Sequence, residues 1–243
     1  MTKYKTVLLI FLAFPFCFYA QKNNECITEL LKIEEKNSIK NFKEEDKVFY
    51  LNYVVTTTDW EDQVIVSNVK VYKGKDNMHF FSEQGQIFQD DNDVFVVLPI
   101  QKIIIVNATN KELNNVRLGN DFYQFRKSFL DSCEVTKCEV SLKNPEVKTL
   151  ELKVHHDMGG LLHIVKMSYK YNTKTEKIIS TVTTYNKDYK VKRVEMIFNE
   201  INLSYDYKFN KARRQVLDKS GRLLPKFKGY ELMDDRDKQK KNK

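Results

Sequence analysis

The stretch HHDMGGLLH, residues 155–163, holds three of the four histidines of the chain together with an aspartate. Neutral imidazole is a common zinc ligand, and histidine is the side chain best suited to transfer protons near neutral pH. The same stretch contains Gly159 and Gly160, and a Gly-Gly pair is typical of a two-residue turn between antiparallel strands. Two interpretations, a metal or catalytic site and the tip of a β-hairpin, therefore have to be separated.

A hairpin that turns at Gly159 and Gly160 has a defined register, because the side chains of a strand alternate between two faces. One face then carries ten side chains, all apolar or aromatic apart from two histidines: Leu150, Leu152, Val154, His156, Met158, Leu161, His163, Val165, Met167 and Tyr169. His155 points to the other face, among charged side chains. We predict that the apolar face belongs to the core or lines a ligand-binding cavity.

In this register the three histidines do not share one face of the hairpin. His156 and His163 face each other with Cβ atoms about 5 Å apart, and no carboxylate of the hairpin shares their face. Zinc usually takes three or four protein ligands, so we predict no metal site, with this pair as the only weak candidate. The chain also lacks a nucleophile elbow, a phosphate-binding loop and a dinucleotide fingerprint. We therefore expect neither a cofactor nor catalytic residues, and predict a protein that is not an enzyme.

The N-terminus, MTKYKTVLLIFLAFPFCFYAQ, has the order of a secretory signal peptide. Two lysines precede an apolar run, and Ala20 ends a small-residue cleavage site, so we predict a signal peptide over residues 1–20. A lipoprotein signal at Cys17 and an uncleaved anchor are the alternatives. No later run is long enough to span a membrane as a helix. We expect a periplasmic or otherwise exported protein.

Three cysteines follow the predicted signal: Cys26, Cys133 and Cys138. Export permits disulfides, and only four residues separate the last two cysteines. Cys133 and Cys138 form the disulfide candidate that we favour, which would leave Cys26 as a thiol. Pairing of Cys26 with one of the other two cysteines is the alternative.

The rest of the chain predicts an α+β fold. Residues 25–36 and 120–131 have apolar side chains at helical spacing, whereas residues 47–108 and 147–201 alternate as two strand meanders. The acidic run at residues 90–93 is predicted to form a turn and not a calcium-binding loop. Residues 207–235 fit either a helix that ends at Gly221 or a hairpin that turns at DKSG. We predict one domain over 21–232, a long-stranded antiparallel sheet with helices packed on one face.

The chain is basic, with a net charge of +8, and it ends in RDKQKKNK. We predict a basic, disordered tail over 233–243. Elsewhere lysines and glutamates alternate, and no basic surface interleaved with aromatic residues is recognisable. A nucleic-acid partner is therefore not expected.

Two long stretches resemble the outer-membrane lipoprotein carrier superfamily, the LolA/LolB-like proteins. They are MHFFSEQGQIFQDDNDVFVVLPIQKIIIVNA and MSYKYNTKTEKIISTVTTYNKDYKVKRVEMIFNEIN. The chain departs from the family's pattern where Asp-Asn replaces the usual Asp-Gly turn, and where residues 202–243 follow the last matching strand. The resemblance implies an incomplete barrel, lined by apolar side chains and lidded by helices, that holds an acyl chain.

Two functions are consistent with these observations. The first is an exported periplasmic carrier or binding protein for a lipid or a lipoprotein acyl group. The second is a non-enzymatic envelope scaffold, part of a secretion or surface-assembly machine, with a protein partner. The C-terminal extension favours the second function, because a simple carrier does not need it.

Overall fold

The computed structural model describes residues 25–37, 47–109, 127–155 and 162–236. The predicted signal peptide, the Gly159–Gly160 turn and residues 237–243 lie outside these ranges. Helices occupy residues 25–36 and 127–131. The strands are β1 (Val48–Asp59), β2 (Val64–Lys73), β3 (Met78–Phe81), β4 (Gln86–Gln89), β5 (Asp93–Leu98), β6 (Ile103–Ala108), β7 (Glu134–Val140), β8 (Val147–Lys153), β9 (Ile164–Asn172), β10 (Lys177–Tyr185), β11 (Val191–Tyr205) and β12 (Glu231–Asp234). Two short helical elements, α5 (Ala212–Val216) and η2 (Pro225–Phe227), lie between β11 and β12.

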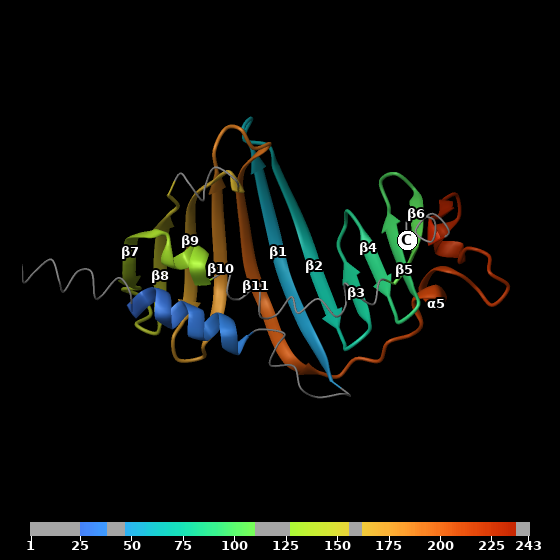
Figure 1. The fold of residues 1–243 in the computed structure, drawn as a ribbon, viewed down its shortest axis with the longest axis horizontal. Helices are drawn as coiled ribbons and strands as arrows, with labels where there is room; N and C mark the ends of the chain where they lie inside the picture. Colours follow the sequence, from blue (N-terminus) through green and yellow to red (C-terminus); the bar gives the residue numbers. More distant parts are fainter. Residues whose placement is uncertain (1–24, 38–46, 110–126, 156–161, 237–243) are drawn as a thin grey trace, which may run out of the picture.

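The twelve strands of the described residues form one open sheet in the order β12-β6-β5-β4-β3-β2-β1-β11-β10-β9-β8-β7 (Figure 1). The two predicted meanders, β1–β6 and β8–β11, are confirmed, and they join where β1 pairs with β11. The sheet is mixed, because β12 runs parallel to β6 while the other neighbours are antiparallel. Strand β7 was not predicted. Its residues lie in a segment where alternation of apolar and polar side chains is weak.

The predicted register of the histidine hairpin holds through most of its length. Leu150 pairs with Tyr169 and Leu152 with Met167, and the Val154 amide donates to the Val165 carbonyl at 3.0 Å. The strand stops before the predicted tip, because His163 has a left-handed backbone with φ of 56° and β9 begins at Ile164. Val165 was expected on the apolar face, but 44% of it is exposed beside an irregular pairing of β9 with β10.

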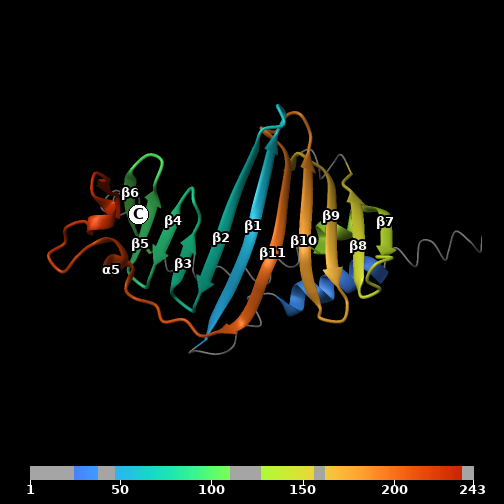
Figure 2. The ribbon, with the colours of Figure 1, turned by 180° about the vertical axis from the view of Figure 1, so that it is seen from behind.

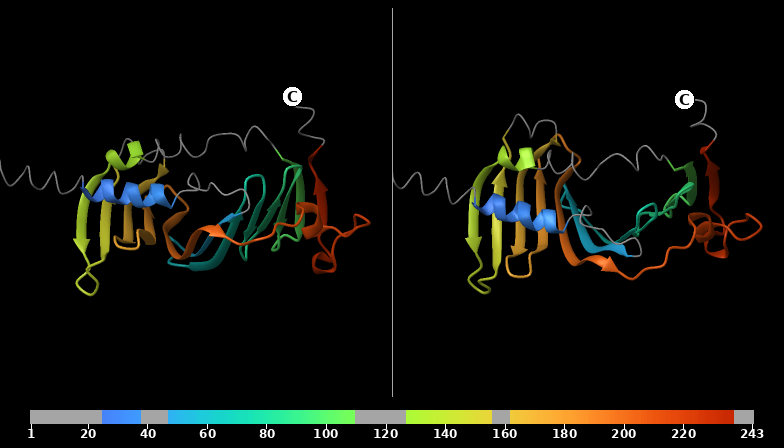
Figure 3. Two further views of the ribbon diagram at one scale, coloured as in Figure 1. Left: turned by 90° about the horizontal axis from the view of Figure 1, so that it is seen from below. Right: turned by 60° about the horizontal axis from the view of Figure 1, so that its bottom comes forward.

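The sheet bends into a trough, and its two ends rise toward the side on which helix 25–36 lies (Figure 3). Directly paired residues of antiparallel neighbours point to the same face. One such row crosses the sheet on the concave side from β9 to β2: Tyr169, Thr181, Met196, Val55 and Ser67. The strands that carry this row are long, so the concave face is continuous across the middle of the molecule.

The opposite, convex face is identified in the same way. Tyr72 alternates with Ser67 along β2, so its side chain points away from the concave side. A second row of pairs continues from it to β6: Tyr72, His79, Phe88, Phe95 and Val106. Several of these residues belong to a hydrophobic core that is distinct from the one beneath helix 25–36.

Two separate hydrophobic cores therefore lie on opposite faces of the sheet. On the concave face, helices 25–36 and 127–131 pack against β8 and β9 through buried residues that include Leu30, Leu130 and Tyr169. On the convex face, α5 and η2 pack against β4–β6 through residues that include Val216 and Phe95. Helix 25–36 lies in front of β8–β10 in Figure 1 and beyond them in the view from behind (Figure 2). The prediction that helices pack on one face is not confirmed, since the strand alternation places α5 on the other side.

The disulfide joins Cys26 to Cys138 across 112 residues of sequence, with 6.5 Å between the Cα atoms. It links the first turn of helix 25–36 to the edge strand β7. The favoured Cys133–Cys138 pairing was wrong, because Cys133 lies at the end of helix 127–131, where its buried thiol donates to the Phe129 carbonyl at 3.2 Å. The alternative that pairs Cys26 with a later cysteine is the one observed.

The C-terminal segment combines both structures that the sequence allowed. The helix α5 is short, and a turn at residues 218–222 then brings Leu223 back to pair with Leu217. Strand β12 extends to Asp234, inside the segment predicted as a tail, and Arg236 bonds Asp93 at 3.1 Å. Among the described residues, no helix combines the length and apolar character needed to cross a membrane.

Candidate functional site

The middle of the concave face carries a continuous set of apolar side chains, which we call the apolar trough. Strand pairing places its members on one face of β11, β1, β2, β3, β4 and β5: Met196, Phe198, Leu51, Tyr53, Val55, Val69, Val71, Phe80, Ile87 and Val96. The rings of Tyr53 and Phe198 lie 5.8 Å apart across the β1–β11 pair. The trough therefore spans six neighbouring strands without a charged side chain among these ten residues.

The apolar trough is not part of either helix-covered core. None of its ten members belongs to the two buried clusters, and all except the buried Val69 are half-exposed. Helices 25–36 and 127–131 reach only the β7–β10 end of the concave face. A contiguous, partly exposed apolar surface is typical of a site that binds an apolar ligand or a partner.

The hairpin face predicted to be core or cavity lining lies in a different part of the concave face. Leu150, Leu152, Val154, Met167 and Tyr169 are all less than 8% exposed, and they pack against the two helices in a closed core. His156, Met158 and Leu161 lie outside the described residues. At the β8–β9 end the apolar face predicted from the hairpin is therefore a packed core, the first of the two alternatives. Half-exposed apolar side chains lie further along the same face of the sheet.

His163 belongs to an aromatic cluster at one end of the sheet. Its ring stacks on Tyr189 at 5.8 Å, and Tyr189 stacks on Tyr185 at 4.5 Å. The Trp60 indole donates to the Tyr189 carbonyl at 2.7 Å. This cluster joins the β1–β2 and β10–β11 turns. Within the described ranges, no group of three or more His, Cys, Asp or Glu side chains is placed to hold a metal ion.

The remaining histidine, His79, was not singled out from the sequence, yet it is the most buried one that the structure describes. It is 1% exposed on the convex face, and its Nδ1 lies 2.8 Å from the Tyr207 hydroxyl. Burial lowers the pKa of His79, and a backbone hydrogen bond at Asn210 opposes this shift. Tyr72 stacks on Tyr207 at 4.0 Å, and burial together with the neighbouring tyrosines raises the pKa of Tyr72 to about 12. These aromatic residues attach residues 205–209 to the outside of the sheet.

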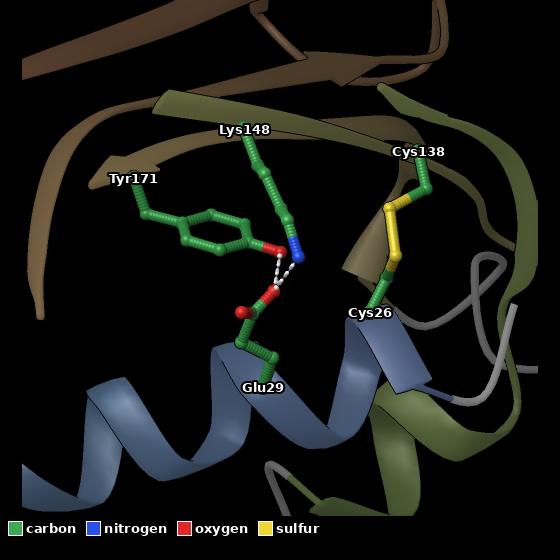
Figure 4. Close-up of a disulfide and its surroundings, with 5 residues drawn as sticks. All are labelled: Cys26, Glu29, Cys138, Lys148 and Tyr171. Carbon is green, nitrogen blue, oxygen red and sulfur yellow. Dashed lines mark hydrogen bonds and ion pairs between the residues drawn. A yellow bond between two sulfur atoms is a disulfide. The ribbon is translucent and has the colours of Figure 1, made fainter. Parts of the chain in front are cut away.

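A second attachment, seen in Figure 4, holds helix 25–36 on the concave face. The Glu29 carboxylate accepts a hydrogen bond from Lys148 at 2.7 Å and one from the Tyr171 hydroxyl at 3.1 Å. Tyr171 is fully buried, and burial and the Glu29 charge raise the pKa of its hydroxyl. With the disulfide next to it, this contact fixes the helix across β8 and β9. The helix therefore acts as a fixed wall at one end of the apolar trough.

No protein-family model matches the chain, and no curated protein matches it. Among solved structures, the chain is similar to an uncharacterized conserved protein from Thermus thermophilus, with 9% identity, a TM-score of 0.40, and coverage of 81% of this chain and 97% of that one. It is also similar to the LolA superfamily protein NE2245 from Nitrosomonas europaea, with 8% identity, a TM-score of 0.30, and coverage of 76% and 95%. A putative outer membrane lipoprotein-sorting protein domain from Vibrio parahaemolyticus is a further match, with 14% identity, a TM-score of 0.29, and coverage of 76% and 96%. At TM-scores of 0.40 and below, these similarities support no conclusion about this chain.

Proposed function

We propose that the protein is an exported, non-enzymatic carrier that binds a lipid or lipoprotein acyl chain in the apolar trough. The observation that carries this proposal is the run of half-exposed apolar side chains across six strands of the concave face. An alkyl chain laid on this surface removes apolar area from water, which stabilises a complex by about 25 cal/mol for each Å² buried. The fixed helix at the β7–β10 end limits the surface on one side.

Export supports the same proposal. The N-terminal sequence has the order of a signal peptide, and the disulfide suits an oxidising compartment. A carrier of acyl chains is useful in an aqueous envelope compartment, because a free alkyl chain there is poorly soluble. The periplasm is the compartment that we propose.

Neighbouring residues of β11 provide the test. Met196 lies in the trough, whereas Ile197 points to the convex face and is 42% exposed. We expect Met196→Asp to weaken binding of the uncharged dye Nile red at least tenfold, about 1.4 kcal/mol, because the carboxylate must lose water when the site fills. Fluorescence titration of the purified protein measures this change.

Ile197→Asp is the matched control and should leave the affinity for the dye unchanged. Circular dichroism and thermal unfolding establish that both variants are folded. Equal loss of binding in both variants, or a wild-type protein that takes up no apolar probe, would refute the carrier function.

One observation favours a second function, an envelope interaction module. Val64, Ile65 and Val66 at the start of β2 are 58%, 56% and 50% exposed. Strand β3 pairs only with the last four residues of β2, so in the described part of the chain the first half of β2 has β1 as its one neighbour. An apolar strand edge of this kind can pair with an extended segment of another protein. Cross-linking from this edge to an envelope protein in cells would support the module.

A further inference from the structure

The apolar trough ends at a lysine. Lys73 is the last residue of β2, and it pairs with Phe49 on one side and with Met78 on the other. It follows Val69 and Val71 at two-residue spacing along the strand, so its side chain lies on the same, concave face. Lys73 is half-buried, unlike Lys70 of the same strand, which is exposed on the convex face.

Lys73 is the one charged side chain that β2, β3, β4 and β5 place on the concave face. The remaining side chains of these four strands on the concave face are uncharged: Ile65, Ser67, Val69, Val71, Met78, Phe80, Ile87, Gln89, Val94, Val96 and Leu98. Among the described residues, no carboxylate lies within ion-pair distance of the Lys73 ammonium. Burial lowers the pKa of Lys73, and the charge of Asp76 in the following turn opposes this shift only in part. Within the described ranges the Lys73 ammonium therefore has no ion-pair partner.

A half-buried ammonium beside apolar side chains complements a ligand that has an anionic group at the end of an alkyl chain. Hydrogen bonds between ionised partners are stronger than neutral ones, and they are stronger still where water is partly excluded. A lysine contributes a single compact charge, which suits the small carboxylate of a fatty acid. A bulkier anionic headgroup offers several acceptors, for which β2, β3, β4 and β5 supply one cation on this face.

We propose that Lys73 anchors the carboxylate of a long-chain fatty acid whose alkyl chain lies in the apolar trough. This inference rests on the proposed function and names the class of ligand. The concave residues of β2 from Lys73 to Ile65 extend over about 26 Å, since a strand rises about 3.3 Å per residue. The carboxylate lies at the Lys73 end, and the chain runs over the side chains of β1, β2 and β3.

Displacement of Nile red by palmitate and by hexadecanol tests the proposal, because the two competitors have equally long chains and differ in charge. We expect palmitate to displace the dye from the wild-type protein at concentrations at least about tenfold lower than hexadecanol. Lys73→Met should reduce this preference to less than threefold while Nile red still binds. Lys73→Arg should retain it, because the positive charge remains.

Lys70→Met is the matched control on the same strand, and the preference for palmitate should be unchanged in it. Equal displacement by palmitate and hexadecanol, with the dye bound normally, overturns the anchor and leaves the carrier function in place. Displacement by phosphatidylglycerol that depends on Lys73, with no such effect of palmitate, overturns the choice of a fatty acid. A protein that binds no Nile red overturns the carrier function and the anchor together.

Discussion

Replacing both Cys26 and Cys138 by serine should lower the free energy of unfolding by about 4 to 5 kcal/mol. The disulfide closes a loop of 112 residues, and a crosslink of this length removes much of the conformational freedom of the unfolded chain. The loss is large compared with the 5–15 kcal/mol by which folded domains are usually stable. Guanidinium unfolding of the unreduced proteins, followed by circular dichroism, measures the difference.

Cys133→Ser is the control for this experiment. It keeps the disulfide and replaces the buried thiol, which donates to the Phe129 carbonyl, by a hydroxyl that can donate to the same carbonyl, so we expect a loss of no more than about 1 kcal/mol. Peptide mapping without reduction should recover Cys26 linked to Cys138. A crosslink that disappears in Cys133→Ser, or a double serine variant as stable as the wild type, would contradict the assigned pairing.

Asp90→Ala should cost about 3 to 5 kcal/mol, the second large effect that we expect. Asp90 is 4% exposed, and its carboxylate accepts hydrogen bonds from the amides of Asn92 at 2.9 Å, Asp93 at 3.0 Å and Ala212 at 2.9 Å. The first two bonds close the β4–β5 turn, and the third joins that turn to the start of α5. Alanine leaves three amides without this acceptor, and a buried donor without a partner costs about 1 to 3 kcal/mol.

The effect of Asp90 depends on pH. Burial by itself raises the pKa of the Asp90 carboxyl, but the hydrogen bonds from the three backbone amides and the charge of Lys211 outweigh burial. The pKa in the fold is therefore lower than the ordinary value, which the unfolded chain retains. The stabilisation is complete above about pH 4 and is lost as the pH falls through the lowered pKa.

The difference in unfolding free energy between wild type and Asp90→Ala should accordingly be constant from pH 5 to 7 and shrink below pH 4. Asp91→Ala, at the exposed neighbouring position, should change stability by less than about 0.5 kcal/mol. A similar loss in both variants would show that Asp90 contributes nothing beyond its place in the turn. Urea unfolding over this pH range provides the values.

The sequence predicted the sheet well because local patterns determine most of it. The Gly159–Gly160 pair and the alternation around it defined the pairing of Leu150 with Tyr169 and of Leu152 with Met167, which the structure confirms. The same alternation identified the two meanders. The pattern also failed locally, since His163 adopts a left-handed backbone that side-chain alternation cannot reveal.

Features that depend on contacts between residues far apart in the sequence were harder to predict from the sequence. The pairing of Cys26 with Cys138 depends on how helix 25–36 lies across β7 and β8, and a short loop between Cys133 and Cys138 carries no information about that. The placement of α5 on the convex face follows from the alternation of side chains across the eight strand pairs from β9 to β6, which requires the strand order. Which part of the concave face stays half-exposed depends on where the helices end, and the alternation within the hairpin carries no information about that.

The central claim is that an alkyl chain lies in the apolar trough, and photo-crosslinking tests it most directly. A palmitic acid with a diazirine near the end of its chain is bound, irradiated, and located by mass spectrometry of the peptides. We expect the label on trough residues distant from Lys73, such as Val55 and Met196, which pair beside Ser67, and its loss when excess palmitate competes. Label on their convex-face neighbours, such as Val54 and Ile197, or none at concentrations that displace Nile red, would contradict the claim.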